Sequence, residues 1–155
     1  AEGETLSREE LAGAVARLAH GDLESVRAAC GQAVQRSGDA EGGEELWWIL
    51  GCVAAGEERR QAWSRAVQVR PTFALGLLFR GAAAHDTGDL PAARADLDAA
   101  LRCNPRLHWA YYRRGLLRRD AGDPAGADED LRLAVQFAPH EWPERTEVDR
   151  LLSGR

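Results

Sequence analysis

Residues 108–141 read HWAYYRRGLLRRDAGDPAGADEDLRLAVQFAPHE, and their order indicates which secondary structure the chain forms. Gly122 follows a run of residues that suit a helix, and glycine accepts the left-handed backbone that ends one. Asp123 can cap a second helix, and Pro124 suits its first turn, where a missing N–H costs nothing. Pro139 stops that helix. The stretch therefore predicts two helices joined by a tight turn.

The same pattern occurs one step of 34 residues earlier, because residues 74–107 share ten identities with 108–141. Residues recur at this step wherever a helix–turn–helix unit needs a proline, a glycine or a small side chain: Pro71, Pro105 and Pro139; Gly81 and Gly115; Gly88-Asp89 and Gly122-Asp123; Ala93 and Ala127; Leu97 and Leu131; Ala100 and Ala134. Such a period is typical of stacked helical repeats.

These residues resemble the tetratricopeptide repeat (TPR) family, whose pattern is an aromatic residue, Leu-Gly, Ala, an aromatic or Leu, Ala and Pro at fixed offsets. The matching residues are Trp47, Leu50 and Gly51 in one unit; Leu77, Gly81, Ala93, Leu97, Ala100 and Pro105 in the next; and Tyr111, Gly115, Ala127, Leu131, Ala134 and Pro139 in the last. The resemblance is clear over about 40–141 and weak over 5–39. It implies an all-α fold, a right-handed α-α superhelix (TPR solenoid) of about four helix pairs plus a C-terminal capping helix.

We expect a single TPR domain over 1–155. Its predicted parts are a degenerate repeat at 5–38, a shortened repeat at 40–73, repeats at 74–107 and 108–141, and a capping helix at 142–155. The repeat at 40–73 is short because Gly51 precedes Pro71 by 20 residues, against 24 in the later repeats, and the difference is about one helical turn. In the capping helix, Val148, Leu151 and Leu152 are expected to cover the last repeat with Trp142.

Two arginines and two aspartates recur together. Arg80 and Arg114 each precede the repeat glycine, and Asp96 and Asp130 each follow their arginine by 16 residues. The repeat at 40–73 has Leu and Ala at these two positions, so the charges are present or absent as a pair. This predicts an Arg–Asp bridge between the two helices of each later repeat, and it removes both arginines from the candidate ligand contacts.

Composition excludes several classes of function. The net charge of −5 argues against nucleic acid, which requires a surplus of cations, and against anionic lipid. The longest uncharged run, Leu46 to Gly56, is far shorter than the roughly 20 residues that span a bilayer. No signal-like apolar block opens the chain, and we expect a cytoplasmic protein. All basic residues except histidine are Arg, a bias that suggests a bacterial source.

Catalysis, metals and cofactors are not expected. The cysteines Cys30, Cys52 and Cys103 are odd in number and have no CxxC spacing, so buried free thiols in a reducing compartment are the better interpretation. The four histidines never occur in pairs at helical spacing, which disfavours zinc. No nucleophile elbow and no phosphate loop with a lysine is present.

The resemblance implies that a partner lies on the inner wall, which is the surface formed by the first helix of each repeat. The predicted partner-binding residues are Trp48, Leu75, Leu78, His85, Trp109, Tyr112, Arg113, Leu116 and Arg119, with Cys52, Ala55 and Ala82 also on this wall. Large exposed aromatic side chains favour a partner surface. The alternative is that Trp109 and Tyr112 pack against the C-terminal segment.

The function that follows is a non-catalytic interaction module or adaptor that binds a partner peptide or helix in its groove. Arg113 and Arg119 would pair with acidic side chains of that partner. Two alternatives stay open: a dedicated secretion or assembly chaperone of the small bacterial TPR type, and an excised TPR domain of a larger multidomain protein.

Overall fold

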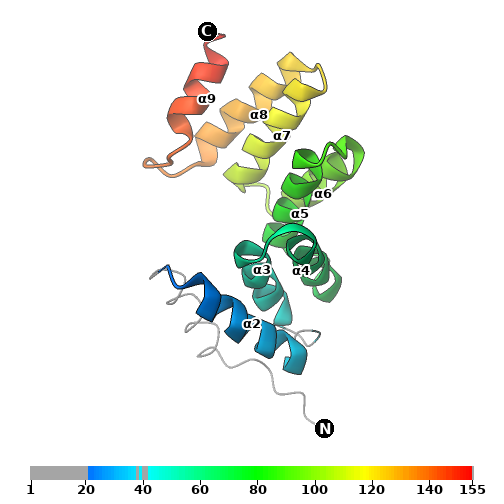
Figure 1. The fold of residues 1–155 in the computed structure, drawn as a ribbon. Helices are drawn as coiled ribbons and strands as arrows, with labels where there is room; N and C mark the ends of the chain where they lie inside the picture. The colour runs from blue at the N-terminus through cyan, green and yellow to red at the C-terminus, as the bar shows by residue number, and fades with distance from the viewer. Residues whose placement is uncertain (1–20, 38, 40–41, 155) are drawn as a thin grey trace. The chain divides into compact units, whose positions relative to one another are not determined.

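The structure is a computed structural model that describes residues 21–37, 39 and 42–154 (Figure 1). Every regular element in this part of the chain is an α-helix, as the sequence predicts. The helices are α2 (Leu23–Ser37), α3 (Gly43–Val53), α4 (Gly56–Val69), α5 (Ala74–Asp86), α6 (Leu90–Cys103), α7 (His108–Asp120), α8 (Pro124–Phe137) and α9 (Arg145–Leu152). The first helix of the predicted repeat at 5–38 lies outside the described residues.

The turns form as the repeated Gly-Asp pair predicts. Gly88 and Gly122 adopt φ of 83° and 80°, the left-handed backbone that only glycine enters without strain. The Asp89 side chain then accepts a hydrogen bond from the backbone N–H of Ala92, and the Asp123 side chain accepts one from Gly126. These bonds satisfy otherwise unpaired donors at the starts of α6 and α8.

The chain forms two compact units, residues 1–76 and 77–155. In the first unit, α3 contacts both α2 and α4. Its core gathers the buried side chains of these three helices: Val26, Cys30, Ala33, Val34, Leu46, Ile49, Leu50 and Ala62. The Glu44 carboxylate, 4% exposed, accepts a hydrogen bond of 2.7 Å from Arg70, so its charge is compensated.

The repeat at 40–73 is shorter than the later repeats mainly because its first helix, α3, ends earlier. After its repeat glycine, α3 continues for two residues to Val53, whereas α5 continues for five after Gly81. The connection to the second helix is also one residue shorter, and α4 keeps the same 14 residues as α6 and α8. The Trp63 ring lies against Gly51, where an added Cβ would fall 2.3 Å from Nε1. A bulky indole thus fills this helix crossing.

The second unit contains α6–α9 and most of α5. Buried alanines and leucines line the contact between helices, and Gly115 lets α7 approach α8, because a Cβ there would meet Leu131 at 3.0 Å. The predicted capping helix is present as α9, with Val148 fully buried and Leu151 and Leu152 packed beside it. Trp142, 4% exposed, joins the same cluster.

The cysteines are free thiols, but only one is fully buried, which corrects the expectation of three buried thiols. Cys30 is buried, Cys52 is half-buried and Cys103 is exposed. Cys103 is the last residue of α6, where the helix end leaves it exposed.

Candidate partner-binding surface

Both predicted Arg–Asp bridges are present. Arg80 donates two hydrogen bonds of 2.7 Å to Asp96, and Arg114 donates two of 2.8 Å to Asp130. The hydrogen bonds to the Asp130 carboxylate raise the pKa of the Arg114 guanidinium above its usual value, although burial acts in the opposite direction. These arginines join the helices of one repeat and are therefore structural.

The second bridge belongs to a larger network than the sequence indicates. Asp130 is 1% exposed and also lies 3.2 Å from Arg118. Arg114 donates a further hydrogen bond of 2.8 Å to Asp98 on α6. A cavity of about 470 Å³ beside this network is lined by Leu90, Pro91, Arg94, Arg114, Leu117, Arg118, Ala121 and Asp123. Its arginines already face aspartates, so it carries no surplus of positive charge.

In the first unit, the predicted wall residues are Trp48 and Leu75, together with Cys52 and Ala55. Trp48 and Leu75 are half-buried, and Ala55 is exposed. The Trp48 ring meets Phe73 edge to face at 6.4 Å, and its backbone carbonyl accepts a hydrogen bond from Trp63. Burial raises the pKa of the Cys52 thiol, although Trp63 and Arg59 act in the opposite direction. The thiol therefore stays protonated and behaves as an apolar group.

In the second unit, two predicted residues of α5 are largely inside the protein. Leu78 is 4% exposed and Ala82 is 8% exposed, so little of either surface is open to a partner. The His85 side chain is about 10% exposed, and its Nε2 lies 2.7 Å from Asp120 on α7. Its Nδ1 atom is buried without a hydrogen-bond partner among the described residues.

The two arginines of the predicted wall already have partners within the chain. Arg113 lies 3.5 Å from Asp86, and Arg119 lies 3.9 Å from Asp128. Arg119 also donates a hydrogen bond of 3.0 Å to the backbone carbonyl of Leu151. Both guanidinium groups thus have an acidic neighbour within the chain, and the expected acidic side chains of a partner stay a prediction.

Asp86 and Asp120 are surface residues that the sequence interpretation missed. Each is the last residue of its helix, α5 or α7, and their side chains are 65% and 63% exposed. Arg113 and Arg119, by contrast, are 33% and 35% exposed. The exposed charge at this end of the wall is thus mainly negative. The sequence contains a signal for these two residues, because an aspartate recurs at the 34-residue step as Asp86 and Asp120.

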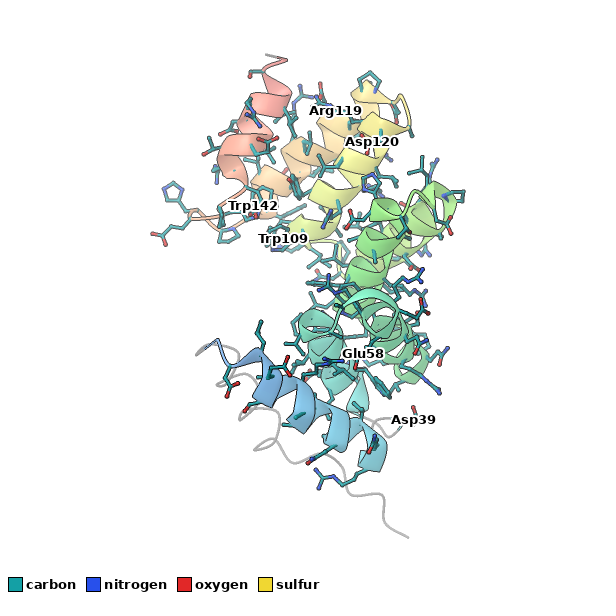
Figure 2. All side chains as sticks on the ribbon, viewed as in Figure 1. Asp39, Glu58, Trp109, Arg119, Asp120 and Trp142 are labelled. Atoms are coloured by element: carbon teal, nitrogen blue, oxygen red, sulfur yellow. The ribbon has the colours of Figure 1, made fainter. Side chains whose placement is uncertain are left out.

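The aromatic residues of α7 pack against the C-terminal segment, which we define as residues 142–152. The Trp109 and Tyr112 rings meet Trp142 nearly at right angles, with centroids 5.6 Å and 5.4 Å away. His108 meets the same indole at 5.4 Å. Figure 2 shows Trp109 and Trp142 close to each other. The packing that the alternative interpretation predicts is therefore present, and a role of these rings in partner binding stays a prediction. Their burial lowers the pKa of His108 and raises the pKa of Tyr112. Leu116, another predicted residue of α7, is half-buried.

The part of the chain that the structure describes holds neither a metal cluster nor a membrane span. Residues 21–37, 39 and 42–154 contain no group of three or more His, Cys, Asp or Glu residues placed to hold a metal ion. Among the described helices, none combines the length and hydropathy that a bilayer span requires.

No protein-family model matches the sequence, and neither does any curated protein. Solved structures do match. MamA is 18% identical with a TM-score of 0.72, over 91% of this chain and 83% of MamA. The thermophilic TPR protein TTC0263 from Thermus thermophilus is 21% identical with a TM-score of 0.68, over 90% of this chain and 78% of its own.

The TPR2B domain of yeast Sti1, solved in complex with pHsp70, is 21% identical with a TM-score of 0.58. That alignment covers 80% of this chain and 94% of the domain. These likenesses show the fold. The chain is an all-α protein with the TPR solenoid fold, which confirms the class predicted from the 34-residue step.

Proposed function

We propose that the protein is a non-catalytic interaction module whose second unit binds a peptide or helix of another protein along α5 and α7. The fold supports this proposal, since a domain of the same fold, TPR2B of Sti1, was solved in a complex with pHsp70. The half-buried Leu116 supplies apolar contact on this surface, and Asp86 and Asp120 supply its exposed charge.

The observation that carries the proposal is the pair of exposed carboxylates. A carboxylate at the C-terminal end of a helix faces the negative end of the helix dipole, which is an unfavourable position. Asp86 and Asp120 occupy it at the same place in successive repeats. Each has a basic neighbour, Arg113 or His85, yet both aspartate side chains remain nearly two-thirds exposed. We therefore propose that the partner segment is apolar with a basic side chain near these residues. Charge complementarity of this kind mainly sets specificity and the rate of association.

The experiment is affinity capture from the native source with quantitative mass spectrometry. The test variant is Asp86→Asn with Asp120→Asn, which removes both charges and keeps the side-chain shapes. The matched control is Glu141→Gln with Asp149→Asn, two exposed carboxylates outside α5 and α7. We expect the test variant to lose a defined protein that the wild type and the control retain.

A second pair of variants tests the apolar contact that Leu116 is proposed to make with the partner. Leu116→Arg places a charge on α7, and Gln136→Arg places the same charge on the exposed surface of α8. Only Leu116→Arg should abolish capture of that protein. If all four variants retain the same proteins with unchanged helix content, the α5–α7 surface is not the binding site.

A further inference from the structure

The C-terminal segment covers an apolar face that the last repeat leaves open. Beneath it lie the buried Leu131 and Ala134 and the partly buried Trp109, Tyr112 and Val135, all on α7 and α8. In phase with the 34-residue step, Trp142 corresponds to His108, so the segment stands where the first helix of a further repeat would begin. This face therefore accepts a helix, and the chain supplies one itself.

Few side chains anchor the segment. Within residues 142–154, only Trp142 and Val148 are buried, and the others are half-buried or exposed. The backbone of the segment is held to α7 by the hydrogen bond that Arg119 donates to the Leu151 carbonyl. Helix α9 has eight residues, too few for a helix that is stable without packing.

The segment also carries features that disfavour its own closed position. The Trp142 Nε1 and one Glu144 carboxylate oxygen are buried without a hydrogen-bond partner among the described residues. A buried polar atom left unpaired opposes burial. Glu144, at the N-cap of α9, makes no capping hydrogen bond, whereas Asp123 caps α8. Such regions open at lower free energy than the core.

We propose that the C-terminal segment is a detachable internal ligand, and that the face beneath it is a second docking surface. Its occupant is an amphipathic helix of a partner with the chemistry of the segment itself: a Trp followed by apolar residues six, nine and ten positions later, as at Trp142, Val148, Leu151 and Leu152. The two surfaces share α7, but the peptide test of this proposal changes neither Asp86, Asp120 nor Leu116, so its failure is distinguishable from failure of the proposed function.

The test uses a fluorescent synthetic peptide of residues 139–153 added to the full chain. In the loosened variant, Trp142→Ala with Val148→Ala, the internal ligand is weakened and the face on α7 and α8 is unchanged. In the control variant, Thr146→Ala with Asp149→Ala, two exposed residues of α9 change instead. Because a closed segment lowers the fraction of competent protein, the loosened variant should bind the peptide at least about tenfold more tightly than the wild type or the control. A peptide with Ala in place of its Trp should not bind.

Hydrogen exchange of the wild type gives a second measurement that needs no variant. The amides of α9 should exchange through an opening that leaves α7 and α8 protected. Equal protection of α9 and α8 would overturn the proposal. So would a loosened variant that keeps its helix content and does not bind the peptide, or one whose second unit unfolds entirely.

Discussion

Replacing Arg114 by leucine removes the centre of the charge network in the second unit. Arg114 donates two hydrogen bonds to Asp130 and one to Asp98, each of 2.8 Å. Its loss leaves the Asp130 carboxylate, 1% exposed, with Arg118 at 3.2 Å as its remaining basic neighbour among the described residues. Breaking a buried pair costs about 3–5 kcal/mol, and the remaining arginine reduces this, so we expect a loss of about 2–4 kcal/mol.

The double variant Arg114→Leu with Asp130→Ala copies the neutral pair of the repeat at 40–73, where Leu50 and Ala62 are both buried. Because no uncompensated carboxylate remains, more than half of the lost stability should return. The assay is urea denaturation of the four proteins of the cycle, followed by circular dichroism.

The matched comparison is Arg80→Leu. Asp96 is 14% exposed, so its carboxylate can reach water after the change, and the loss should be only about 1–2 kcal/mol. If the Arg114 and Asp130 effects add to within about 0.5 kcal/mol, the two residues are not coupled and the reasoning fails.

Four other changes should be visible in denaturation experiments. Gly51→Ala forces a Cβ into the Trp63 ring and should cost about 1–3 kcal/mol; an unchanged midpoint would show that the ring moves freely. Asp123→Ala removes the cap of α8 and should cost about 1 kcal/mol, with faster exchange at the first turn of that helix as the check. Trp109→Ala removes a ring from the aromatic cluster and should cost about 3–5 kcal/mol, against the small effect expected of a fully exposed side chain. Burial lowers the pKa of His108 below its ordinary 6.5, so the folded state resists protonation of this ring. The contribution of the neutral ring to folding stability is therefore complete above pH 6.5, and it is lost as the pH falls through the pKa of the folded state. A His108→Gln variant should lack that loss in denaturation curves at descending pH.

The helices could be predicted from the sequence because their ends are determined locally. A left-handed glycine, an aspartate cap and a proline each act within a few residues, so Gly122, Asp123 and Pro124 suffice to place a turn. The bridge from Arg114 to Asp130 was predictable for a related reason, since its two residues lie on neighbouring helices of one repeat and recur together.

Contacts beyond one repeat could not be predicted in the same way. The hydrogen bond from Arg114 to Asp98 depends on how α6 lies beside α7, and no spacing within one repeat encodes it. The exposure of Trp109 was misjudged because the family pattern places it on the open wall, whereas a neighbour outside the repeats, Trp142, covers it. The burial of Tyr111 was misjudged in the opposite direction. The family pattern makes it an inward residue, and its ring does stack on Phe137, but the side chain stays half-buried.

The hydrogen bond from Arg114 to Asp98 has a consequence for how the second unit melts. Helix α6 belongs to one helix pair and α7 to the next, so this bond adds to the coupling between adjacent pairs, while Asp130 holds α7 to α8 within its own pair. In a linear array, the strength of nearest-neighbour coupling decides whether the repeats melt one after another or in a single transition. One guanidinium group that serves both contacts makes the two pairs unfold cooperatively. An Asp98→Ala variant should broaden the transition of the second unit even where its midpoint changes little.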